Sequence, residues 1–193
     1  MVLRKNKDSL LPLDKEKLES IAVIGKMAFD PRYQGSGSSK INPDRIEAPY
    51  DAIADETGDK VRLLTAQGYS DSSEEKHRRI VAEAAETAGK ADVAVVFAGL
   101  PDKLESEGYD RTSLKLPENQ LEMIQRVCEE QPDTIVVLFN GGVVDLAFED
   151  QPKAVLEAWL GGQAVGAAVS DILFGCVNPV SYTHLDVYKR QSI

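Results

Sequence analysis

The chain has 193 residues, of which 42% are hydrophobic and 28% charged, so it can bury the core of one globular domain. Its formal net charge of −10 repels phosphate backbones and anionic lipid surfaces. We therefore expect no nucleic-acid partner and no membrane partner.

Apolar segments in the chain alternate between strand-like and helix-like patterns. Short runs rich in β-branched residues predict strands at residues 20–25, 61–66, 93–100, 134–139 and 154–159. Apolar spacing, early prolines and Ala-rich composition predict helices at residues 49–56, 73–91, 116–131 and 162–175. We expect an α/β fold, a doubly wound and mainly parallel sheet of five or six strands with helices on both faces. In such folds the functional residues lie in loops at the carboxyl ends of strands, which singles out the loops after Gly25, Leu100 and Phe139.

Three carboxylates crowd the loop that follows residues 93–100. This loop reads LESEGYDRTSLKLP and contains Glu105, Glu107 and Asp110. A carboxyl group can act as a general acid when burial or nearby negative charge raises its pKa toward the working pH, and the crowding here would do so. Arg111 could neutralise Asp110 and fix the loop, which leaves a glutamate to carry the proton. The alternative is a solvated acidic loop with an Asp–Arg surface pair.

A second loop, GSGSS at residues 35–39, combines glycines that permit close backbone approach with serine hydroxyls. Phosphate binding is one interpretation, but a dinucleotide fingerprint would stand directly at the strand-to-helix turn, and here that turn reads GKMAFDP. A flexible surface loop is the other.

The positions of the two cysteines and of His77 in the sequence do not indicate a catalytic or metal-binding role. Cys128 and Cys176 lie in apolar segments, outside any CxxC or Cys/His cluster, so we expect buried thiols and no metal site. His77 stands among lysine and arginine residues, so we expect it on the solvated face of its helix.

Five segments together resemble the C-terminal domain of family 3 glycoside hydrolases, over residues 2–179. They are VLRKNKDSLLPLDKEKLESIAVIG, YQGSGSSKINP, ADVAVVFAGLPDKLESEGYDRTSLKLPENQ, VVLFNGGVVDLAF and KAVLEAWLGGQAVGAAVSDILFGCVNP. ESEGYDR is the most specific block. In this family a (β/α)₈ barrel is followed by an α/β sandwich, and the barrel supplies an aspartate nucleophile. The resemblance implies a β-glucosidase-like enzyme that cleaves O-glycosyl bonds with retention, without a cofactor or metal, and the barrel and a glucoside or oligosaccharide as partners.

The resemblance also assigns roles to residues. Glu107 matches the family's general acid/base, with Glu105 as the second choice two residues away. Ser36 or Ser38 is implied to approach the sugar bound in the barrel. The residues implied to support the loop around the acid/base are Tyr109, Asp110 and Arg111.

The resemblance stops short at both ends of the chain. No segment offers the barrel motif that holds the nucleophile, and residues 180–193, VSYTHLDVYKRQSI, do not resemble the family. We expect a domain at residues 1–179, followed by an artefactual or disordered tail, within a fragment whose localisation depends on sequence upstream. Two alternatives stay open: a non-catalytic sugar-binding or interaction domain of the same architecture, and a nucleotide- or flavin-binding protein of the doubly wound class.

Overall fold

The computed structural model describes residues 1–70, 73–108 and 110–179, and its strands form one six-stranded sheet. The strands are β1 (Val2–Asn6), β2 (Ser20–Ile24), β3 (Arg62–Ala66), β4 (Val93–Gly99), β5 (Thr134–Phe139) and β6 (Ala154–Glu157). Their order is β1-β6-β5-β4-β2-β3. Every neighbouring pair is parallel except β1 with β6, which confirms the predicted mainly parallel sheet.

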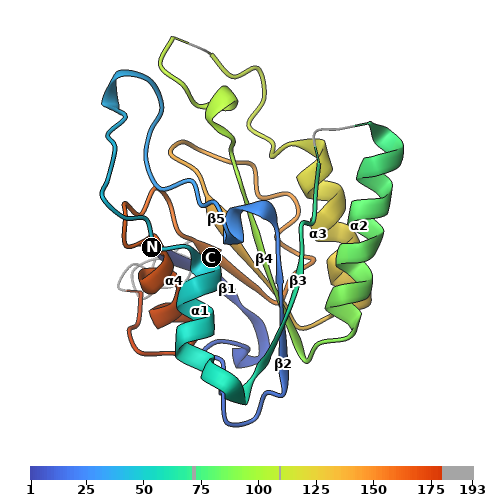
Figure 1. The fold of residues 1–193 in the computed structure, drawn as a ribbon. Coiled ribbons are helices and arrows are strands. Elements are labelled where there is room, and N and C mark those ends of the chain that lie inside the picture. Colours follow the sequence, from blue (N-terminus) through green and yellow to red (C-terminus); the bar gives the residue numbers. More distant parts are fainter. Residues whose placement is uncertain (71–72, 109, 180–193) are drawn as a thin grey trace, which may run out of the picture.

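Helices cover both faces of the sheet, as predicted (Figure 1). They are α1 (Pro49–Thr57), α2 (Glu74–Gly89), α3 (Glu118–Glu130) and α4 (Val165–Leu173). Alternate residues of each central strand serve the two faces. Phe97 and Phe139 lie in the core with α1 and α4, while Ala98 and Leu138 lie in the core with α2 and α3. Within the described ranges, no helix has the length and apolar character needed to cross a bilayer.

The edge strand β1 was not predicted. Its sequence, VLRKN, has only one deeply buried side chain, Leu3, so it shows neither the apolar run nor the alternation of a core strand. The strand forms because its backbone pairs antiparallel with β6, from Val2 opposite Glu157 to Asn6 opposite Ala154. A partner about 150 residues away in the chain leaves no local pattern in the sequence, so this strand depends on tertiary pairing.

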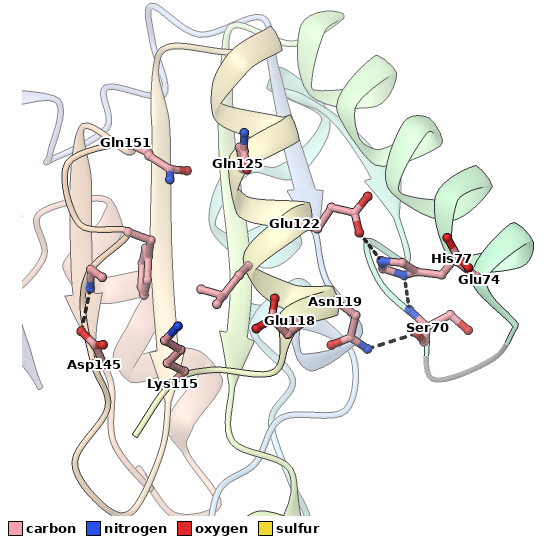
Figure 2. Close-up of a pocket in the computed structure, with 13 residues that line it drawn as sticks. Ser70, Glu74, His77, Lys115, Glu118, Asn119, Glu122, Gln125, Asp145 and Gln151 are labelled. Carbon is pink, nitrogen blue, oxygen red and sulfur yellow. Dashed lines mark hydrogen bonds and ion pairs between the residues drawn. The ribbon is translucent and has the colours of Figure 1, made fainter. Parts of the chain in front are cut away.

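His77 is buried, and the expected solvated position is wrong. It lies on the α2 face that packs against α3, because it shares the spacing of the buried residues Val81 and Ala84. Its ring contacts the Glu122 carboxylate at 3.0 Å and accepts from the Ser70 amide at 3.4 Å (Figure 2). The charged residues next to His77 in sequence lie on the exposed face of the helix. Their charge suggested a solvated position for His77, although its spacing matches that of the buried residues.

The two cysteines differ from one another. Cys128 on α3 is half-buried, and burial raises the pKa of its thiol to about 11. Cys176 is exposed, contrary to expectation, because the chain turns at Gly175, which has φ +76°, and leaves the apolar face of α4.

Candidate functional site

The three loops singled out by the strand-end rule meet at the carboxyl edge of the sheet. They follow β2, β4 and β5, and the first two extend beyond the sheet side by side (Figure 1). A parallel backbone bridge joins them between Ser36 and Ser106. The bridge thus joins the loops after β2 and β4 into one structure, in which Glu105 and Glu107 lie on either side of Ser106.

Glu105 is held by a buried arginine. Arg32, in the loop after β2, forms an ion pair with the Glu105 carboxylate, and the two side chains are only 6% and 11% exposed. The same guanidinium donates to the carbonyls of Leu100 at 2.9 Å and Glu105 at 3.2 Å, and its Nε lies 3.3 Å from an Asp102 oxygen. Arg32 therefore fixes the start of the acidic loop. Sequence reasoning missed it, since a lone arginine in a polar stretch carries no pattern.

The turn after β5 supplies the other partners of Glu105. The Gly141 amide donates to Oε2 at 2.8 Å, and the Gly142 amide donates to Oε1. Together with Arg32, these donors occupy both carboxylate oxygens. Glu105 is thus a structural anchor that joins all three loops.

Glu107 is exposed and contacts the Gly/Ser loop instead. Its Oε2 accepts from the Ser38 hydroxyl and from the Ser38 amide at 3.2 Å. Hydrogen bonds from the Ser38 hydroxyl and amide lower the pKa of Glu107, so the upward shift expected from crowded carboxylates is wrong for this residue. Gly37 makes the contact possible: its φ is +86°, and a Cβ there would lie 2.9 Å from the Glu107 Cβ.

The remaining predicted residues take separate positions. Ser36 is half-buried, and its hydroxyl has no hydrogen-bond partner among the residues that the structure describes. Arg111 donates to the Val143 carbonyl at 2.5 Å, and within the described ranges it forms no ion pair with exposed Asp110, so the expected pair is wrong. Tyr109 and residues 180–193 lie outside the described residues.

A buried carboxyl group stands behind the glycine turn. Glu157, the last residue of β6, is 6% exposed. Burial raises its pKa to about 7, against hydrogen bonds from the Trp159 amide at 3.2 Å and the Asn140 side chain at 3.3 Å. Arg4 on the neighbouring strand lowers this pKa, and Glu105 raises it.

Glu157 should make stability depend on pH. Because folding raises its pKa from 4.5 to about 7, its contribution is fully present below pH 4.5 and is lost as the pH rises through about 7. We expect the unfolding free energy of wild type, relative to Glu157→Gln, to fall by about 3 kcal/mol between about pH 4 and pH 8. Urea unfolding at both pH values measures it. The same substitution at exposed Glu83 on α2 is the control, and a constant difference between wild type and Glu157→Gln would contradict the assignment.

Among the described residues, one pocket lies between these loops, and a groove of larger volume lies away from them. A groove of about 620 Å³ runs between α3, the start of α2 and residues 145–151, with His77 and Glu122 in its wall (Figure 2). A smaller pocket of about 450 Å³ is lined by residues of the loops after β2 and β4, including Arg32 and Asp102. We take the loops as the candidate site because they contain the predicted residues Ser38, Glu105 and Glu107, none of which lines the larger groove.

The fold and the loops define a class: a doubly wound α/β domain with an exposed glutamate on a loop anchored at the carboxyl edge of its sheet. A sequence profile described as "Glycosyl hydrolase family 3 C-terminal domain" matches residues 1–192. The chain belongs to this family.

Relatives of the chain are named as glycosidases. The chain is 50% identical over 179 residues to "Thermostable beta-glucosidase B" of Acetivibrio thermocellus. This alignment covers 93% of the chain and 23% of the relative. It is 40% identical over 187 residues to "Exo-alpha-(1->6)-L-arabinopyranosidase" of Bifidobacterium longum, covering 93% and 24%. The crystal structure of a family 3 β-glucosidase from Bifidobacterium adolescentis superposes with a TM-score of 0.83 at 43% identity, covering 92% of this chain and 26% of that one. The chain spans about a quarter of the length of these relatives.

Proposed function

We propose that this domain supplies the general acid/base, Glu107, to a retaining β-glucosidase-like active site whose nucleophile comes from a barrel domain. The contrast between two neighbouring glutamates carries the proposal. Three donors occupy both oxygens of Glu105, whereas Glu107 is exposed and, among the described residues, accepts hydrogen bonds only from the Ser38 hydroxyl and amide. Of the two glutamates, Glu107 is therefore the better candidate to meet a substrate from outside the domain.

The proposed chemistry takes two steps. In the first, the barrel carboxylate attacks the anomeric carbon while the glycosidic C–O bond breaks, and Glu107 gives its proton to the departing oxygen. In the second, Glu107 takes a proton from water, which attacks the anomeric carbon and releases the barrel carboxylate. Ser36 and Ser38 are the two predicted substrate contacts. Ser38 would also donate a hydrogen bond to the Glu107 carboxylate between the two steps.

Donation requires a protonated Glu107, yet Ser38 lowers its pKa while the carboxyl faces water. Enclosure by a barrel and a bound sugar would remove that water and penalise the charged form, which raises the pKa. The proposal therefore assigns the required upward shift to the assembled site and not to this domain.

The lowered pKa also favours a second candidate, a non-catalytic domain of the same architecture in which the Ser38–Glu107 contact only joins two loops. Under this alternative the proton donor stands elsewhere in the enzyme. The two candidates differ in what happens when Glu107 loses its side chain.

Azide rescue separates them. The test enzyme is a chimera in which this chain replaces the matching segment of the Acetivibrio thermocellus β-glucosidase. With 2,4-dinitrophenyl β-glucoside, Glu107→Ala should lose turnover because water is no longer activated in the second step. Azide needs no base, so it should restore turnover and yield β-glucosyl azide. An inactive chimera, or a Glu107→Ala variant that forms no glucosyl azide, would contradict the proposal. Glu83→Ala serves as the azide-insensitive control.

A further inference from the structure

The glycine turn that binds Glu105 is itself hydrogen-bonded by a buried asparagine side chain. Asn140, the residue after β5, is 1% exposed. Its side-chain nitrogen donates to the Gly142 carbonyl at 2.9 Å and to the Glu157 carboxyl at 3.3 Å. One side chain thus closes the turn and ties it to the end of β6.

The turn fits Glu105 with little room to spare. A Cβ at Gly142 would lie 2.8 Å from the Glu105 Oε1, and a Cβ at Gly141 would lie 3.0 Å from the Leu160 side chain and 3.5 Å from the Glu105 Oε2. A small shift of the turn therefore changes where Glu105 sits.

Movement of Glu105 must reach Glu107, because only Ser106 separates them. The Ser106 backbone is bridged to Ser36, which restrains the loop from sliding along its neighbour. A contiguous chain of hydrogen bonds runs from Glu157 through Asn140 and the turn to Glu105, and covalently on to Glu107.

We propose that Asn140 is a positioning residue for the proton donor: by closing the Gly141–Gly142 turn around Glu105, it fixes the loop that presents Glu107. The proposal rests on the proposed function of Glu107. A misplacement of about 1 Å in a catalytic group can cost about 10²-fold in rate. The loss should fall on proton donation, since Asn140 is 1% exposed and is therefore covered from groups outside this domain.

Leaving-group dependence reports proton donation. An unactivated alkyl glucoside needs a proton on its departing oxygen, whereas 2,4-dinitrophenolate leaves without one. In the chimera, Asn140→Ala and Gly142→Ala should each lower kcat/KM for methyl β-glucoside by about 10-fold or more, and that for the dinitrophenyl glucoside by less than about 3-fold. Gly142→Ala removes no buried polar group, so it tests the turn even where Asn140→Ala unfolds. Gly89→Ala on α2, whose Cβ would meet nothing closer than 3.8 Å, is the matched control.

The outcomes separate this proposal from the proposed function. A purely structural role for the turn would lower kcat/KM for both substrates alike, which overturns the positioning proposal. If Glu107→Gln itself shows no leaving-group dependence, the proposed function fails. If Glu107→Gln shows it and both turn variants keep the wild-type ratio, only the role of Asn140 fails.

Discussion

Replacing Glu107 by glutamine in the chimera should lower kcat/KM for an unactivated glucoside by about 10²–10⁴-fold, the range that one general acid contributes. Glutamine keeps the size of the side chain and can still accept from Ser38 through its amide oxygen, so the Ser38 contact seen here is largely kept. What it cannot do is release a proton. The effect should shrink to about 10-fold or less with 2,4-dinitrophenyl glucoside, whose leaving group needs no acid.

Steady-state kinetics with a series of aryl glucosides measures this effect as a slope of log kcat/KM against leaving-group pKa. The slope should steepen in Glu107→Gln and stay at the wild-type value in Glu83→Gln, which removes the same charge from the exposed face of α2. Equal losses across the series would show that Glu107 affects folding or binding and not proton donation. A normal rate on methyl glucoside would remove it from the mechanism.

The central fold follows from local sequence because its strands are buried on both faces. The expected strands at residues 93–100 and 134–139 correspond to β4 (Val93–Gly99) and β5 (Thr134–Phe139), since a parallel sheet covered on both sides demands continuous apolar runs. β1 was not predicted because an edge strand needs only one buried face and pairs with a partner that is distant in the chain.

The sequence predicted that the three loops of the candidate site would meet, but it did not predict which of their side chains would pair. The rule that parallel strands bring their carboxyl ends to one edge led to three loops, and all three meet at Glu105. The rule cannot say which charge meets which. Arg32 pairs with a glutamate 73 residues away, while Arg111, beside Asp110 in sequence, reaches the Val143 carbonyl. Side-chain partners in loops depend on three-dimensional placement, which a single sequence does not encode locally.

The Arg32–Glu105 pair should dominate the stability of this edge. Replacing Arg32 by methionine keeps most of the aliphatic volume but leaves the Glu105 carboxylate, 11% exposed, without its cation. Removing one partner of a buried ion pair destabilises by about 3–5 kcal/mol. Because the Gly141 and Gly142 amides still bind Glu105, we expect about 3 kcal/mol, the lower end of that range. Urea unfolding of the chain measures this as a fall in the midpoint at unchanged slope.

The same substitution elsewhere provides the comparison. Arg126 pairs with Glu129 one helical turn away on α3, with side chains 49% and 43% exposed, so Arg126→Met should cost less than about 1 kcal/mol. Adding Glu105→Gln to Arg32→Met should recover part of the loss, because the uncompensated charge disappears. If Arg32→Met were no more harmful than Arg126→Met, the pair would contribute nothing measurable. The anchoring of the Glu107 loop would then have to come from the glycine turn, whose amides would be the remaining donors to Glu105.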